Sequence, residues 1–206
     1  MITLCDLTFL LLGFLVVWYV SDKKHIVAQV KPRVIAAETP KTAQLTAGTK
    51  DALDLGGWLA VRDDIERHID DLHLKGDIRV QAAHNEILIS LKETVPFASG
   101  KADLRPAVLP VIEKVAAIAL TQGTLQLEIR GHTDNRPIST AEFPSNWELS
   151  AARASRVARY LIEKGVPPSR ITVQGFASQR PSYPAAGAAG RSVNRRVEIR
   201  LYQKGK

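Results

Sequence analysis

The sequence predicts an α+β protein in which a single N-terminal transmembrane helix is followed by a two-layer α/β sandwich. The first twenty residues are almost wholly apolar. From Asp77 onward the chain has the order strand, strand, helix, strand, helix, strand, strand, which combines neighbouring and crossover connections and places two helices on one sheet. A length of 206 residues with 45% hydrophobic and 24% charged side chains allows one ordinary domain plus attachments.

Residues 1–20 have the length and composition of a membrane span. Twenty residues at about 1.5 Å rise each cover a hydrocarbon core of roughly 30 Å. Trp18 and Tyr19 close the run, where aromatic side chains anchor a helix at the interface. A cleaved signal peptide is the alternative, but no basic segment precedes the run and no small-residue cleavage site precedes Lys23. We therefore expect a retained transmembrane helix.

Asp6 is the one charged side chain of this span. A carboxylate in mid-membrane costs roughly 2.5 to 3.5 kcal/mol, so such a residue usually faces a partner or a water path. So near the chain start, Asp6 can instead lie at the interface and favour the helix N-terminus. The basic residues that follow are Lys23, Lys24, Lys31 and Arg33, and the positive-inside rule alone would place the rest of the chain in the cytoplasm.

Residues 21–50 are predicted to form a tether, because they are polar and Pro32 and Pro40 interrupt helix continuation. Over residues 51–75, apolar side chains recur at three- and four-residue multiples between charged ones. This pattern predicts an amphipathic helix that packs on its own domain or on a second copy of the chain. Its apolar positions are Leu55, Trp58, Ile65, Ile69 and Leu72.

Residues 76–202 contain the strands of the predicted sandwich. Apolar and polar residues alternate on both sides of His84 and Asn85, which predicts a β-hairpin. Three further segments alternate in the same way or are short and apolar between turn signals. The strands are expected over residues 78–82, 87–91, 125–129, 171–175 and 197–201.

Two helices are expected between these strands. The first covers residues 104–120, where Pro110 predicts a kink. The second covers residues 145–164, because Ser145 and Glu148 have the spacing of a capping box. Gly165 after it provides the usual helix end.

Charge and cysteine content limit the kind of site. Cys5 is the only cysteine, so the chain forms no intramolecular disulfide and no cysteine-based zinc site. From Thr121 to Lys206 there are fourteen Lys and Arg against six Asp and Glu, a balance of +8 that exceeds the +7 of the whole chain. We expect partners of this part to be anionic or to present carboxylates.

Five short motifs stand out in the same part of the chain. They are Gly131-His-Thr-Asp134, Asn146-Trp-Glu-Leu-Ser-Ala-Ala-Arg153-Ala154, Gly165-Val166, Arg170-Ile171 and Asn194-Arg195-Arg196-Val197-Glu198. In order and spacing they resemble the peptidoglycan-binding domain shared by OmpA-like proteins and the motor protein MotB. The resemblance covers about Asp77 to Leu201. The segments around Trp147 and Asp6 look more like MotB than like the porin-type members.

The resemblance implies a MotB-like, ion-conducting stator subunit of a membrane motor. It implies a single-pass protein of the inner membrane with an OmpA-like domain in the periplasm, against the charge bias described above. The implied partners are peptidoglycan with a diaminopimelate-type stem peptide, a MotA-like four-span membrane protein and a second copy of the chain as a homodimer. Asp6 would bind the coupling ion, a proton or sodium. A non-conducting envelope tether between inner membrane and cell wall is the alternative, with Asp6 a bystander.

A stem peptide of this type presents an ammonium and a carboxylate on one carbon, so its receptor needs one anion and one cation close together. Asp134, on the loop that leaves a strand, is suited to the ammonium. Arg153 is suited to the carboxylate, which a guanidinium holds with a two-pronged fork. A salt bridge between these two residues that merely holds the loop on the helix is the alternative. The resemblance adds four binding residues: Thr133, Asn146, Asn194 and Arg196.

Strand alternation separates two of the arginines. Val197 belongs to the buried face of the last strand, so Arg195 is expected to point toward the helix layer and Arg196 away from it. The family pattern further implies that Asn194 and Arg196 brace the binding loop.

Other functions are less compatible with the residues. His132 and Asp134 lie on one loop without a third ligand, so we predict no metal, cofactor or catalytic function. A membrane-anchored nucleic-acid binder lacks the stacking aromatic residues it needs and leaves the Asp134 motif unexplained, so we predict no nucleic-acid partner. Its candidate cations are Arg153, Arg156, Arg159, Arg195, Arg196 and Arg200.

Overall fold

The computed structural model describes residue 53 and residues 55–83, 85–184 and 187–204. All of them belong to a compact unit that spans Gly48–Lys206. The expected transmembrane helix with its aspartate, and the tether, lie outside the described residues. No helix within the described ranges combines the length and the apolar character that crossing a bilayer requires.

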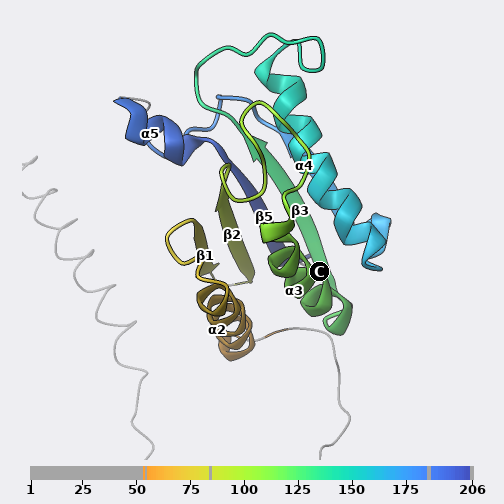
Figure 1. The fold of residues 1–206 in the computed structure, drawn as a ribbon. Coiled ribbons are helices and arrows are strands. Elements are labelled where there is room, and N and C mark those ends of the chain that lie inside the picture. Colours follow the sequence, from red (N-terminus) through yellow and green to blue (C-terminus); the bar gives the residue numbers. More distant parts are fainter. Residues whose placement is uncertain (1–52, 54, 84, 185–186, 205–206) are drawn as a thin grey trace, which may run out of the picture. The chain divides into compact units, whose positions relative to one another are not determined.

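One mixed sheet of five strands forms the centre of the domain. The strands are β1 (Ile78–Ala83), β2 (Glu86–Lys92), β3 (Leu125–His132), β4 (Ile171–Gly175) and β5 (Arg196–Gln203). Their order in the sheet is β1-β2-β5-β3-β4. The β3–β4 pair is parallel and the other three pairs are antiparallel. All five strands were predicted, and β5, the last along the chain, is the central one (Figure 1).

Three helices pack on this sheet. They are α2 (Leu55–Asp71), α3 (Leu109–Thr121) and α4 (Asn146–Glu163). Helix α2 contacts β1, α4 contacts β3 and β4, and α3 lies between the two helices (Figure 1). The two-layer α+β architecture is therefore confirmed. A further short helix, α5 (Gly187–Asn194), precedes β5 and was not predicted.

The core lies between the sheet and the three helices. Ile89, Ile199 and Ile129 stand side by side on β2, β5 and β3, and all three are 0% exposed. Alternation places every second residue of these strands in the core because successive side chains point to opposite faces. The residues between them face the other side of the sheet.

Helix α2 packs on its own domain, which is one of the two predicted arrangements. Trp58, Ile65 and Ile69 are buried in the common core. Leu55, at the first position of the helix, is 61% exposed. Leu55 therefore lies outside the core of its own domain, which the buried positions of the stripe join.

The segment before α3 differs from the predicted kinked helix over residues 104–120. Pro106–Val108 form a 3₁₀ turn, and α3 begins only at Leu109. Pro110 stands in the first turn of α3. Its missing N–H costs nothing there because the first N–H groups of a helix have no partner within the helix. The proline therefore begins a helix and does not kink one.

Both predicted ends of α4 are present. Ser145 is the N-cap residue, and its hydroxyl accepts the N–H of Trp147 at 3.1 Å. Gly165 has a φ of +96°, and its N–H donates to the carbonyl of Ile162 at 2.9 Å. Glycine adopts this left-handed conformation without strain. These caps set the position of α4 along the sheet.

Two glycines let α4 approach the ends of β3 and β4. A Cβ on Gly131 would lie 2.0 Å from the carbonyl oxygen of Ser150, and one on Gly175 would lie 2.8 Å from the backbone nitrogen of Ala151. No side chain fits at these distances. The loops that follow the two parallel strands therefore emerge beside the first turns of α4.

Candidate functional site

Thr133 joins the loops that follow β3 and β4. Its N–H donates to the carbonyl of Ala177, in the loop after β4, at 2.8 Å. Its hydroxyl donates to the carbonyl of Asp134 at 2.9 Å. The residue is 5% exposed. These bonds hold the loop with Asp134 at the carboxyl end of the parallel pair.

Both carboxylate oxygens of Asp134 are occupied. Oδ1 accepts a hydrogen bond from the backbone N–H of Arg136 at 3.0 Å, and Oδ2 accepts one from Nη1 of Arg195 at 2.8 Å. The residue is 6% exposed. Asp134 thus faces a cation. In the described part of the chain that cation is Arg195, and no direct salt bridge joins Asp134 to Arg153.

Arg153 lies in the interior and is 2% exposed. Its Nη2 forms an ion pair with Glu93, and its Nε donates to the carbonyl of Lys101 at 2.9 Å. The guanidinium carbon lies 5.2 Å from the centre of the Phe97 ring. Burial lowers the pKa of Arg153, and the charge of Glu93 opposes this shift. An arginine remains charged under such conditions.

Glu93 connects the two predicted ligand residues. One of its oxygens pairs with Arg153, and Oε2 lies 2.6 Å from Nε of Arg195. Burial acts to lower the pKa of Arg195, but Asp134 and Glu93 outweigh it and raise the pKa. The four side chains form a network of alternating charge in the order Asp134, Arg195, Glu93, Arg153. We call it the ion-pair network.

Two members of the ion-pair network were not among the predicted site residues. Alternation with Val197 indicated the direction of Arg195, and its contacts on the side of α4 agree with that expectation. Nothing in the sequence marked Glu93. It follows a strand at a position where a charged side chain usually meets solvent.

Asn146 holds the loop after β3 on the helix. Its Nδ2 donates to the carbonyl of Arg136 at 2.8 Å and to that of Asp134 at 3.4 Å. As the first residue of α4, it is positioned by the N-cap described above. The residue therefore supports the carboxylate of Asp134 through the backbone.

Asn194 and Arg196 brace the segment before α5. The side-chain oxygen of Asn194 accepts the N–H groups of Ser182 and Tyr183 at 2.9 and 3.0 Å, and its Nδ2 donates to the carbonyl of Tyr183 at 2.9 Å. Nη2 of Arg196 donates to the carbonyl of Arg180 at 3.3 Å. Both residues thus hold the chain that returns toward β5.

The face of the sheet opposite the helices α2, α3 and α4 carries paired charges. Arg200 lies 3.1 Å from Glu128, and Nε of Arg196 lies 2.7 Å from Glu198. Nε2 of His132 lies 3.4 Å from Glu198, close enough for an ion pair but outside hydrogen-bond geometry. Burial raises the pKa of Glu198, but His132 and Arg196 outweigh it and lower this pKa to about 2.

Most of the arginines considered for nucleic-acid binding are paired with carboxylates in the described structure. In each pair the carboxylate partly neutralises the guanidinium, which weakens its attraction to a phosphate backbone. The pairs are Arg153–Glu93, Arg156–Asp103, Arg195–Asp134, Arg196–Glu198 and Arg200–Glu86.

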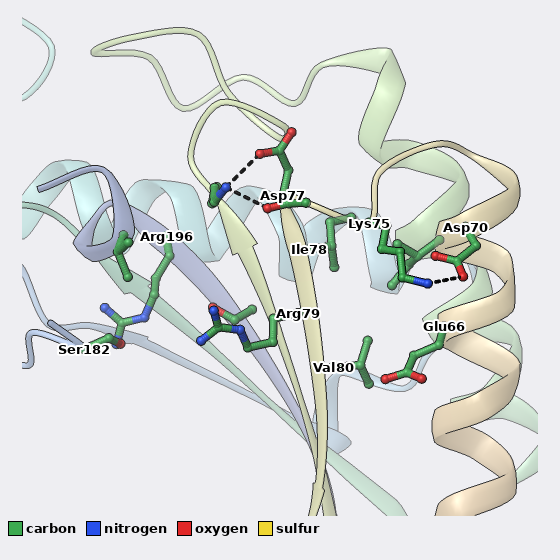
Figure 2. Close-up of a pocket in the computed structure, with 14 residues that line it drawn as sticks. Glu66, Asp70, Lys75, Asp77, Ile78, Arg79, Val80, Ser182 and Arg196 are labelled. Carbon is green, nitrogen blue, oxygen red and sulfur yellow. Dashed lines mark hydrogen bonds and ion pairs between the residues drawn. The ribbon is translucent and has the colours of Figure 1, made fainter. Parts of the chain in front are cut away.

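A cavity of about 430 Å³ lies at the β1 edge of the sheet. Figure 2 shows Asp70 and Lys75 paired at its wall, where their charged atoms are 2.9 Å apart. Glu66 and Arg79 add one charge of each sign to the lining. Of the predicted site residues that the structure describes, only Arg196 contributes to this cavity. The cavity is therefore separate from the ion-pair network.

Comparison with known proteins gives several matches. The OmpA family matches residues 96–195. Motility protein B of Bacillus subtilis is 32% identical over 146 residues, which are 70% of this chain and 56% of that protein. The chain thus spans little more than half the length of this relative.

Two solved structures share the fold. The cell wall anchor of the T6SS from Pseudomonas aeruginosa is 34% identical, with 69% of this chain and 99% of that chain covered and a TM-score of 0.61. A MotB-like protein from Desulfovibrio vulgaris is 26% identical, with 72% and 96% covered and a TM-score of 0.66. Together with the family match, these similarities show that the chain belongs to the OmpA family.

Proposed function

We propose that this protein anchors to peptidoglycan, and that residues 76–202 form an OmpA-like domain that binds a diaminopimelate-type stem peptide in the periplasm. The ion-pair network is the observation that carries the proposal. It holds a carboxylate and a guanidinium at its two ends, which are the groups that an ammonium and a carboxylate on one carbon require. The similarity to a cell wall anchor supports the same function.

In this proposal Asp134 binds the ammonium of the ligand and Arg153 binds its carboxylate. Nε and Nη2 of Arg153 already contact Lys101 and Glu93. Among the described residues, none accepts a hydrogen bond from Nη1 or forms an ion pair through it, so this nitrogen is assigned to the ligand in place of the expected two-pronged fork. Thr133 and Asn146 position the loop, and Asn194 and Arg196 brace the segment beside it. No catalytic function is proposed.

A sacculus pull-down tests the wall-binding proposal. The wild-type chain should sediment with purified peptidoglycan, whereas Asp134→Asn should lose most of this binding because the amide carries no charge for the ammonium. Asp103→Asn is the matched control, since Asp103 pairs with Arg156 on the surface. Thermal unfolding of each variant shows whether it is folded. Equal sedimentation of Asp134→Asn and wild type would refute the proposal.

We further propose that the whole protein is a MotB-like stator subunit of the inner membrane. In this proposal residues 1–20 span the membrane, residues 21–50 tether the domain, and the protein acts as a homodimer with a MotA-like four-span partner. The similarity to Motility protein B supports it. Taking up an ion at Asp6 would neutralise a costly charge and allow the surrounding subunits to shift, while the wall anchor converts the shift into torque.

Replacement of Asp6 by Asn tests this finer proposal. The variant should assemble with the four-span partner but conduct no ions and support no motor function. The alternative, a non-conducting envelope tether, is favoured by the similarity to the T6SS wall anchor. A tether predicts that Asp6→Asn has no phenotype. Ion flux measured in vesicles that contain both proteins separates the two functions.

A further inference from the structure

Arg195 occupies the position at Asp134 that a ligand ammonium would need. Its Nη1 is 2.8 Å from Oδ2, and the N–H of Arg136 takes the other carboxylate oxygen at 3.0 Å. The side chain of Asp134 is only 8% exposed. Each oxygen keeps a further lone pair, but the carboxylate is largely covered, and displacement of the guanidinium of Arg195 is the direct way for a cation from outside to reach it.

Arg195 is the member of the ion-pair network with the freedom to move. Its side chain is 33% exposed, against 10% for Glu93 and 2% for Arg153. Its Nε is held by Glu93 at 2.6 Å, independently of the contact with Asp134. The guanidinium is planar and rigid, so Nη1 leaves Asp134 when torsions of the flexible methylene chain swivel the whole group about its bond to Glu93, which keeps the charge of Arg195 paired.

The ion-pair network is electrically neutral, because two carboxylates face two guanidinium groups. When a zwitterionic end group binds, the net charge of the network and ligand together stays at zero. An ammonium alone leaves one positive charge in excess among side chains that are mostly withdrawn from water. Such an uncompensated charge is costly at low solvent exposure.

We propose that Arg195 determines the specificity of the site for an end group that carries both charges on one carbon. In the complex the ligand ammonium replaces Nη1 at Asp134, and the released Nη1 of Arg195 pairs with the ligand carboxylate while Nε stays on Glu93. A simple amine replaces the ion pair between Arg195 and Asp134 with one ion pair of its own. The zwitterion forms that pair and adds a second one between its carboxylate and Arg195. This inference rests on the proposed binding of stem peptides and names the residue that selects among them.

Calorimetric titration of the full chain with two synthetic stem peptides tests the proposal. The peptides are identical except for the third residue, which is meso-diaminopimelate in one and lysine in the other. The wild type should prefer the diaminopimelate peptide by on the order of tenfold or more. Arg195→Gln should reduce this ratio toward one, chiefly because the lysine peptide binds better to the unmasked Asp134.

Three further variants complete the experiment. Arg195→Met is a second neutral variant in case the glutamine variant does not fold, and Arg195→Lys keeps the charge and should keep most of the preference. Arg156→Gln removes an arginine that pairs with Asp103 outside the network and should leave the ratio unchanged.

If the neutral variants fold but keep the wild-type ratio, or bind both peptides more weakly to the same degree, the role of Arg195 is overturned. The proposed function would still stand. Failure of the wild type to bind either peptide would overturn the proposed function and this inference together.

Discussion

Glu93 and Arg153 form a buried ion pair across 60 positions of the sequence. Glu93 directly follows β2, and Arg153 stands in the middle of α4. The pair therefore ties the sheet to the helix that borders the proposed site. Burying two charges is costly, so each of them depends on the other for compensation.

Replacement of Glu93 by Gln should destabilise the protein by about 3 to 5 kcal/mol, because Arg153 then remains buried without a counter-charge. Urea unfolding of the full chain measures this change. Asp103→Asn removes the partner of Arg156, and the side chains of that pair are 74% and 44% exposed. This control should cost less than about 1 kcal/mol. Similar losses in the two variants would contradict the buried role of Glu93.

Gly131→Ala should destabilise the domain by about 1 to 3 kcal/mol or more, because its Cβ would lie 2.0 Å from the carbonyl oxygen of Ser150. Thermal unfolding provides the measurement. Gly123→Ala is the control, since a Cβ there meets nothing within 4 Å. If both alanine variants unfold at the wild-type temperature, α4 does not lie as close to β3 as described.

Acid should weaken the fold through Glu198. Its pKa is lowered from 4.5 to about 2 in the folded protein, so the carboxylate stabilises the fold fully above the ordinary pKa. This contribution, at most about 3 kcal/mol, is lost as the pH falls from about 4.5 to 2. Urea unfolding between pH 6 and pH 2 should therefore show a shallower acid decline for Glu198→Gln than for wild type. Parallel curves would show that Glu198 is not the group responsible.

Asn194→Ala should loosen the segment before α5. The substitution removes three hydrogen bonds to the backbone of Ser182 and Tyr183, each worth about 0.5 to 1.5 kcal/mol. Hydrogen exchange at these two amides should become faster, while exchange in β3 stays the same. Weaker peptidoglycan binding with unchanged exchange would instead identify Asn194 as a direct ligand contact.

The strands could be predicted because their alternation is a local property of the sequence. Helix α5 could not, since it has only eight residues and includes Gly187 and Gly190, and glycine is a poor helix former. The predicted helix over residues 104–120 was too long at its start. There Pro106 begins a 3₁₀ turn, which the apolar spacing does not distinguish from an α-helix.

The site was predictable only in part. The loop position of Asp134 follows from the strand before it, and the place of Arg153 on α4 follows from the helix that the capping box at Ser145 predicts. The link between them depends on Glu93, a charged residue whose burial arises from two segments far away in the sequence. The sequence pattern around Glu93 does not indicate such a contact.

The position of β5 in the sheet has a consequence for biogenesis. This strand is synthesised after the other four and yet separates the β1–β2 hairpin from the β3–β4 pair. Until residues 196–203 are available, each half of the sheet exposes an unpaired edge that invites aggregation. A chain shortened before Arg196 should therefore expose both edges permanently and be removed by proteases.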